Sequence, residues 1–229
     1  MRAPVIRKDC AALRVSPNLT DPQRAGFAWE RVRASLAGLP QGALNLAHEA
    51  IERHAQGSRA AHVALRWLGA EGDELQFTYA DLSALTNRFA SAITALDLKR
   101  GDRLFLLLPR IPELYIAALG ALKAGLTVSP LFSAFGPEPI ATRVNLGGGR
   151  ALLTTRELYE RKVAGIRAQM PTLDIVLIAG SHEGGDVPAG TLHLDPLLDA
   201  ASDRFDTVAT RPDEMALLHF TSGTTGKPK

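Results

Sequence analysis

Residues 103–109, RLFLLLP, constrain the fold of this chain more than any other stretch. Five apolar side chains follow Arg103 without a polar residue between them, whereas a strand with one face in water alternates polar and apolar residues. A continuous apolar run of this length is typical of a strand in a parallel sheet that helices cover on both faces. The run therefore predicts an α/β domain built in layers.

Strand-like and helix-like segments alternate along the chain beyond this run. We expect strands at 126–132, 150–155, 173–180 and 214–220, and helices at 112–124, 137–147 and 157–170. This β-α-β order predicts a layered, mainly parallel sheet with helices on both faces. The turn-rich stretch 181–191 is expected to be a surface loop.

The first hundred residues predict a different arrangement. We expect a helix that starts after Thr20 and runs through 26–38, a helix at 43–55, a hairpin made of 60–68 and 74–79, and a helix at 81–96 capped by Thr78. The chain is accordingly divided into an irregular and helical extension, 1–42, and a partial α/β domain, 43–229.

Composition excludes several classes of protein. With 229 residues, 46% of them apolar, the chain can bury a core, and 26 basic against 24 acidic residues are not gathered into a stripe, so no nucleic acid partner is expected. Cys10 is the single cysteine, which rules out an internal disulfide and a multi-cysteine metal cluster and agrees with a reducing compartment. No window approaches about 18 uninterrupted apolar residues. We therefore expect a cytoplasmic protein without a membrane partner.

The chemical character of the chain is concentrated in its last residues, HFTSGTTGKPK, 219–229. Glycines let backbone N–H groups approach phosphate oxygens, hydroxyls donate further hydrogen bonds, and lysine adds positive charge. The run follows an expected buried strand, and ligands of open α/β sheets gather outside the carboxyl ends of the strands. These residues therefore predict a phosphate-binding loop.

A Walker A loop, G-x-x-x-x-G-K-[ST], is the competing interpretation of the same residues. Aligned on Gly226 and Lys227, that pattern requires glycine at 221 and serine or threonine at 228, but the chain has Thr221 and Pro228. Pro228 also lacks an N–H and disfavours helical geometry at Lys227, where a Walker loop passes into a helix. The residues therefore argue against the Walker loop.

TSGTTGKPK resembles, residue for residue, the signature of the adenylate-forming superfamily, which includes acyl-CoA synthetases. The stretch 77–144, above all GDRLFLLLPRIPELYIAALGALKAG and PLFSAFGPE, resembles the N-terminal part of acetyl-CoA synthetases of the prokaryotic type. The resemblance implies that the loop handles the β- and γ-phosphates of ATP while a carboxylate attacks the α-phosphate. The nucleotide-binding candidates carried over in this way are Thr221, Ser222, Gly223, Thr224, Thr225, Gly226 and Lys227.

The resemblance also implies an activity. It points to an ATP-dependent carboxylic acid–CoA ligase, an acid–thiol ligase of the acetate type, whose substrates are a small carboxylic acid, ATP and coenzyme A, with Mg²⁺ arriving on the ATP. Members of the superfamily continue for several hundred residues beyond this lysine. We therefore expect an N-terminal fragment, an incomplete domain without catalytic residues or a metal site of its own, and no turnover by this polypeptide alone.

Two alternatives stay open on the residues alone. The chain could belong to a medium-chain acyl-CoA synthetase, because such ligases share the phosphate loop. It could also be a non-catalytic, truncated module that binds a nucleotide or a partner. SAFGPE, 133–138, is expected to act as a turn that caps the next helix, with a role on the substrate side as the less favoured reading.

Overall fold

The computed structural model describes residues 26–180 and 186–221. The chain divides into two compact units, 1–37 and 38–229, which are treated separately. The described part of the first unit contains α2 (Trp29–Ser35), with Trp29 68% exposed. This helix is shorter than the 26–38 expected, because Ala28 and Leu36 are both extended. Thr20 lies outside the described residues, and the predicted division into 1–42 and 43–229 stays a prediction.

The second unit begins with short elements that differ from the single helix expected at 43–55. A 3-10 turn, η2 (Pro40–Gly42), is followed by an isolated antiparallel bridge between Leu44 and Thr210. The helical part starts only after Asn45, whose side-chain oxygen accepts a hydrogen bond from the Ala47 N–H at 2.9 Å. It continues as a π-helical turn, η3 (His48–Glu52), and as α3 (Arg53–Ala55). The first residues of the expected helix are therefore taken up by pairing with a distant segment.

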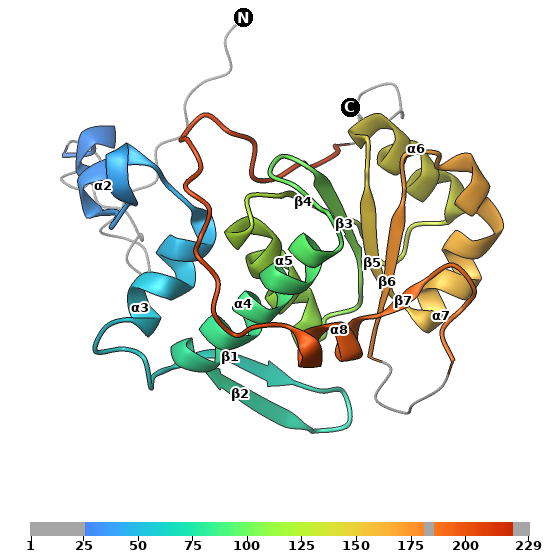
Figure 1. Cartoon of the computed structure of the whole chain (residues 1–229), viewed down its shortest axis with the longest axis horizontal. Helices are drawn as coiled ribbons and strands as arrows, with labels where there is room; N and C mark the ends of the chain where they lie inside the picture. The colour runs from blue at the N-terminus through green and yellow to red at the C-terminus, as the bar shows by residue number, and fades with distance from the viewer. Residues whose placement is uncertain (1–25, 181–185, 222–229) are drawn as a thin grey trace, which may run out of the picture. The chain divides into compact units, whose positions relative to one another are not determined.

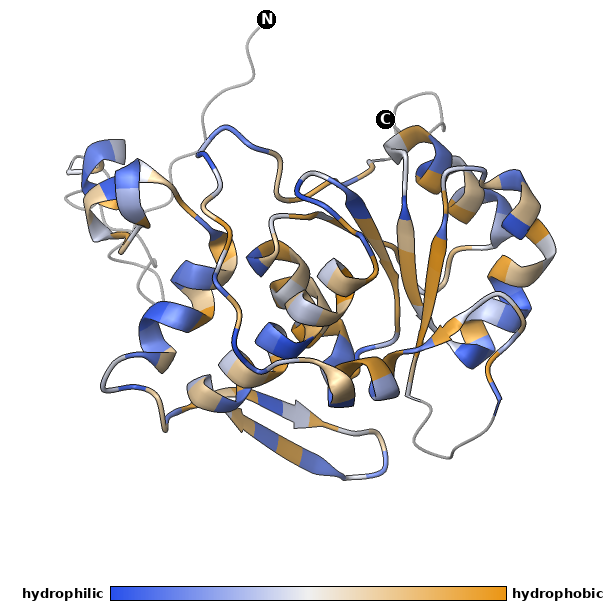
Figure 2. Cartoon of the chain, viewed as in Figure 1, coloured by the Kyte–Doolittle hydropathy of each residue, from blue (hydrophilic) through white to orange (hydrophobic). Residues whose placement is uncertain are grey.

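The hairpin and the helix after it follow the sequence pattern. β1 (Val63–Leu68) and β2 (Glu74–Thr78) pair antiparallel, and polar and apolar residues alternate along β2 (Figure 2). α4 (Tyr79–Ala95) starts with a capping box, in which the Thr78 hydroxyl accepts from the Asp81 N–H and the Asp81 carboxylate accepts from the Thr78 N–H. The predicted Thr78 cap is confirmed.

A five-stranded parallel sheet forms the centre of the second unit, as predicted (Figure 1). Its order is β4-β3-β5-β6-β7, and every neighbouring pair is parallel. The strands are β3 (Arg103–Leu107), β4 (Thr127–Pro130), β5 (Ala151–Thr155), β6 (Ile175–Ala179) and β7 (Leu192–His193). The apolar run of β3 is buried, as its sequence predicted.

Helices cover both faces of this sheet. On one face, Leu104 and Leu106 of β3 pack in a core with residues of α4, of α5 (Pro112–Lys123) and of α8 (Leu194–Ala200). On the other face, Phe105 and Leu107 pack with residues of α6 (Pro137–Gly147) and of the helical segment that begins with α7 (Arg156–Leu158). Alternate residues of one apolar strand thus serve two cores, which accounts for the missing polar positions in its sequence.

Two expected elements differ in detail, and two further elements were not expected. The helix expected at 157–170 is broken into α7, a π-helical η4 (Tyr159–Val163) and a 3-10 helix, η5 (Ala164–Gln169). The break falls at Val163, whose φ is −113°, two residues before Gly165, a residue of low helix propensity. β7 and α8 were not predicted, since β7 is only two residues long and α8 carries Pro196 near its start. The strand expected at 214–220 makes a single parallel bridge, Leu217 with Val128.

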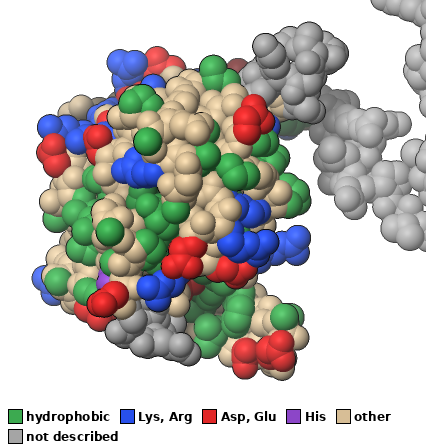
Figure 3. Space-filling view, turned by 90° about the vertical axis from the view of Figure 1, so that its right-hand side faces the viewer, with side chains coloured by type: hydrophobic (Ala, Val, Ile, Leu, Met, Phe, Trp, Pro, Cys, Tyr) green, Lys and Arg blue, Asp and Glu red, His purple; other side chains and the backbone are tan. Residues whose placement is uncertain are grey.

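The described surface carries charged side chains of both signs. On the side shown in Figure 3, basic and acidic side chains are interspersed among the described residues, and neither sign forms a continuous stripe. Nothing tests the prediction that nucleic acid is not a partner. Within the described ranges, no helix is long and apolar enough to cross a membrane.

Candidate functional site

The segment that leads into the predicted phosphate loop lies along the outer side of β4. We call residues 215–220 the edge segment. The Val128 N–H donates to the Ala216 carbonyl, and the Leu218 N–H donates to the Val128 carbonyl, both at 2.9 Å. The pairing is parallel, so the edge segment ends where the neighbouring strands β4 and β3 end. The predicted loop therefore begins at the carboxyl edge of the sheet, where ligands of parallel α/β sheets gather.

Two hydroxyls of β4 fix the register of the edge segment. Thr127 Oγ1 donates to the Met215 carbonyl at 2.9 Å, and Ser129 Oγ donates to the Leu218 carbonyl at 2.8 Å. Both side chains are buried, and each has a backbone carbonyl of the edge segment as its hydrogen-bond partner. Sequence reasoning missed this role. The available signal was the repeat of hydroxyl residues two positions apart in an otherwise apolar strand.

Alternate side chains of the edge segment point in opposite directions, as in a strand. Met215, Leu217 and His219 are exposed, whereas Leu218 and Phe220 are half-buried. The Phe220 ring stacks on the Phe105 ring, with centroids 6.4 Å apart and an angle of 27° between the planes. The residue directly before the predicted loop is thereby anchored to the core of the sheet.

The approach of this segment to α6 depends on a residue without a side chain. A Cβ placed on Gly147 would lie 2.8 Å from Phe105 Cζ, 2.9 Å from Leu218 Cδ2 and 3.2 Å from Phe220 Cζ. Those distances are shorter than carbon atoms tolerate without moving. Gly147 therefore allows the two inward side chains of the edge segment to pack over the end of α6.

An ion pair with Arg100 holds Glu214, the residue directly before the edge segment. Glu214 accepts hydrogen bonds from the Arg100 guanidinium, with Arg100 Nε at 2.8 Å, and from the Arg211 N–H at 2.9 Å. These donors, the Arg100 side chain first, lower the pKa of Glu214 to about 2. The carboxylate is therefore ionised throughout the neutral range and ties the segment to the turn before β3.

The chain directly after β4 lies at the same carboxyl edge. The Leu131 N–H donates to the Leu106 carbonyl at 2.8 Å, and the Arg143 guanidinium lies 4.2 Å above the Phe135 ring. Phe132 is 65% exposed and meets Phe135 edge to face, with centroids 5.8 Å apart. Gly136 is extended and precedes Pro137, the first residue of α6, in agreement with the expected turn before that helix.

Of the predicted nucleotide-binding residues, the structure describes one. Thr221 is exposed and directly follows the anchored Phe220. The other six lie outside the described residues, so their roles stay predictions: Ser222, Gly223, Thr224, Thr225, Gly226 and Lys227. Among residues 26–180 and 186–221, no three His, Cys, Asp or Glu side chains are placed to hold a metal ion.

A parallel sheet with a glycine- and hydroxyl-rich sequence following its edge segment defines an α/β domain of the kind that binds ligands outside its carboxyl edge. The family model described as AMP-binding enzyme matches residues 51–229. The chain belongs to this family.

Individual relatives agree with the family. The chain is similar to the acetyl-coenzyme A synthetase of Bacillus subtilis (strain 168), with 34% identity over 206 residues that cover 89% of this chain and 35% of the relative. It is also similar to the mitochondrial acyl-coenzyme A synthetase ACSM3 of Mus musculus, with 32% identity, covering 76% of this chain and 29% of the relative. The chain spans about a third of the length of these curated relatives.

Solved structures give the same result for the fold. The crystal structure of an acyl-CoA synthetase from Brucella canis superimposes with a TM-score of 0.79 at 28% sequence identity, covering 89% of this chain and 36% of that one. The predicted resemblance to the adenylate-forming enzymes and the predicted α/β fold are both confirmed.

Proposed function

We propose that this sequence supplies the phosphate-binding part of an ATP-dependent carboxylic acid–CoA ligase. The observation that carries the proposal is the position of the edge segment, which ends at the carboxyl edge of the sheet directly before TSGTTGKPK. Family membership supports the same reading. In this proposal the loop 221–227 binds the β- and γ-phosphates of ATP, with Mg²⁺ entering as the ATP complex.

The chemistry proposed is the one that the family resemblance implies. A carboxylate oxygen of the acid attacks the α-phosphorus of ATP, the bond from that phosphorus to the bridging oxygen of the β-phosphate breaks, and pyrophosphate leaves. Negative charge then accumulates on the leaving pyrophosphate, where hydroxyl, backbone N–H and lysine donors of the loop would stabilise it. In the second step the sulfur of coenzyme A attacks the acyl carbonyl, a thioester forms and AMP leaves.

We propose acetate as the acid. Its support is the similarity to proteins named acetyl-coenzyme A synthetase, at 34% identity for the Bacillus subtilis protein and 31% for that of Methanothrix soehngenii. Proteins named acyl-coenzyme A synthetase match at similar identity, 32% for the mouse protein, which supports a longer acid as the alternative. The cytoplasm is proposed as the location, and 43–229 as the partial nucleotide-binding domain.

Acid-dependent release of pyrophosphate tests this function. The assay uses the polypeptide at the length that it has in its native cells, with acetate, butyrate and octanoate offered in parallel. We expect pyrophosphate release that requires both ATP and acid and is fastest with acetate. The rate should fall about tenfold or more in Lys227→Ala, because the negative charge on the leaving pyrophosphate loses the lysine ammonium that stabilises it. The control is Lys99→Ala, an exposed lysine in the turn that precedes β3.

A second candidate function is a non-catalytic module that binds a nucleotide or a partner. Its support is that the family match includes the phosphate motif and covers about a third of the curated relatives. ATP binding without acid-dependent pyrophosphate release by the native polypeptide would support this function. Release with any of the three acids would reject it.

A further inference from the structure

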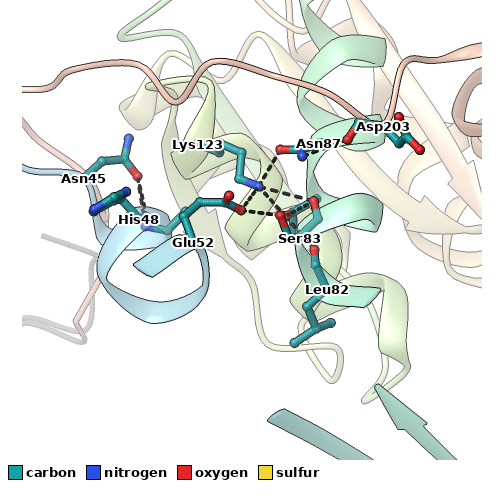
Figure 4. A network of polar contacts seen from close by, with 10 residues as sticks. Asn45, His48, Glu52, Leu82, Ser83, Asn87, Lys123 and Asp203 are labelled. Atoms are coloured by element: carbon teal, nitrogen blue, oxygen red, sulfur yellow. Dashed lines mark hydrogen bonds and ion pairs between the residues drawn. The ribbon is translucent and has the colours of Figure 1, made fainter. Parts of the chain in front are cut away.

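A buried ammonium lies at the end of α5, away from the candidate site. Lys123 is fully buried, and Figure 4 shows its Nζ surrounded by side chains of η3 and α4. It donates to Glu52 Oε1 at 2.5 Å, to Asn87 Oδ1 at 2.6 Å and to Thr86 Oγ1 at 2.7 Å, with the Ser83 carbonyl at 3.4 Å. All three N–H groups of the ammonium therefore have acceptors.

Burial of these charged groups costs free energy that an apolar interface between the same helices would not cost. Burial lowers the pKa of Lys123, although Glu52 opposes the shift, and Glu52 is itself buried, with Ser83 Oγ donating to it at 2.8 Å. Replacement of a buried ion pair by apolar side chains of similar size is often neutral or stabilising. Stability alone therefore does not explain why Lys123 and Glu52 are charged. We look instead to the hydrogen bonds that Lys123 and its partner Asn87 make with residues 203–208.

The first of these bonds runs through Asn87. Because the amide oxygen of Asn87 accepts from Lys123, its NH₂ group is turned outward, and it donates to the Asp203 carbonyl at 2.8 Å. We call residues 201–214 the strap; they run from α8 to the edge segment. The ammonium therefore selects the orientation of the amide that holds the strap.

The second connection uses the backbone of the same lysine. The Val208 N–H of the strap donates to the Lys123 carbonyl at 2.9 Å. Asn45 donates to the carbonyls of Leu122 and Val208, at 2.8 and 3.0 Å, and so joins the end of α5 to the strap from the other side. The Asn87 amide and the Lys123 backbone carbonyl thus hold the strap at Asp203 and Val208, five residues apart.

The strap leads directly into the edge segment. After Val208, Thr210 pairs with Leu44, and Glu214 is held by Arg100. The following residues are those that Thr127 and Ser129 hold along β4. A shift of the strap along α4 and α5 would therefore be passed on to the residues that precede the loop.

We propose that Lys123, Glu52 and Asn87 form a positioning centre, which sets the place of the strap and, through it, of the edge segment that leads into the predicted phosphate loop. The last link rests on the proposed function, because it concerns how the loop meets ATP. The three residues do not touch the nucleotide in this proposal. Asn87 bonds to Asp203, the Lys123 backbone carbonyl accepts from the Val208 N–H, and Glu52 acts through the Lys123 ammonium.

Amide hydrogen exchange and ATP binding together test this proposal. The double variant Glu52→Leu/Lys123→Met replaces the ion pair by apolar side chains of similar size, an exchange that buried ion pairs often tolerate. We expect exchange at the Val208 and Leu218 amides to rise about tenfold or more, while amides of β3 and β5 keep the exchange of the parent chain. Binding of ATP with Mg²⁺ should weaken by about tenfold.

Two further variants make the result specific. Asn87→Ala removes the amide that joins Lys123 to the strap and should have the same local effect; it also replaces the double variant if that protein does not fold. Thr94→Ala is the matched control on α4, because its hydroxyl bonds to the Ala90 carbonyl of the same helix. It should leave exchange in the strap and ATP affinity unchanged.

The two failures can be distinguished. Unchanged exchange at Val208 and Leu218 in both the double variant and Asn87→Ala would overturn the positioning centre, whatever the ATP affinity. Faster exchange spread evenly over the sheet would overturn it as well, because it would indicate general destabilisation. If exchange accelerates locally in the variants but the parent chain does not bind ATP, the proposed function is rejected. The positioning of the edge segment is then still supported.

Discussion

Substitution of Gly147 by alanine is expected to displace the edge segment. The added Cβ would lie 2.8 to 3.2 Å from carbon atoms of Phe105, Leu218 and Phe220. Phe105 is fully buried in the sheet, so the two residues of the edge segment are the ones with room to move. Overpacking of this kind costs about 1–3 kcal/mol. Alanine in place of a helical glycine returns up to about 1 kcal/mol, and the expected net loss of stability is about 0–3 kcal/mol.

Gly165→Ala is the matched control, because a Cβ on this helical glycine would meet no atom within 4 Å. Urea unfolding followed by circular dichroism should place Gly147→Ala below Gly165→Ala by about 1–3 kcal/mol, since the gain in helix propensity largely cancels between them. Hydrogen exchange at the Leu218 amide should accelerate in Gly147→Ala alone. If Gly147→Ala is as stable as the control and Leu218 exchanges as in the parent chain, the packing described for the edge segment is wrong.

Three further predictions concern neighbouring contacts. The pKa of Glu214 is lowered to about 2, so its ion pair contributes to folding stability above pH 4.5, and this contribution is lost as the pH falls from 4.5 through 2. In Arg100→Gln, the titration midpoint of Glu214, followed by ¹³C NMR of its carboxyl carbon, should rise toward 4.5. An unchanged midpoint would reject the pairing. Ser129→Ala removes the hydrogen bond to the Leu218 carbonyl and should cost about 0.5–1.5 kcal/mol in urea unfolding; no loss would mean that this hydroxyl does not hold the segment. Thr78→Ala should cost about 0.5–2 kcal/mol in the same assay because α4 loses its cap, whereas Thr78→Ser should retain most of the stability.

The central sheet and its helices could be predicted because local sequence carries them. The apolar run of β3 requires cover on both faces, and Pro112 and Pro137 mark the starts of α5 and α6. The Thr78 cap was readable for the same reason, since a capping box involves residues three apart. Family membership was readable from nine consecutive residues of one motif.

Other features depend on contacts between residues far apart in the sequence. Leu44 looks like part of a helix, but its backbone pairs with Thr210, 166 positions away. Lys123 looks like an ordinary charged residue near a helix end, and its burial follows from Glu52 and Asn87 approaching from two other helices. No local pattern signals such partners, because periodicity and propensity report only on neighbouring residues.

Binding of ATP with Mg²⁺ to residues 1–229, measured by isothermal titration calorimetry, tests the central claim most directly. The parent chain is compared with Lys227→Ala, in the predicted loop, and with Lys99→Ala, an exposed lysine elsewhere. The account predicts saturable binding by the parent chain and by Lys99→Ala, and affinity lower by about tenfold or more in Lys227→Ala, because the phosphates lose a charged hydrogen-bond donor. Equal affinity in all three proteins, or no binding by the parent chain, would contradict the assignment of 221–227 as the phosphate loop.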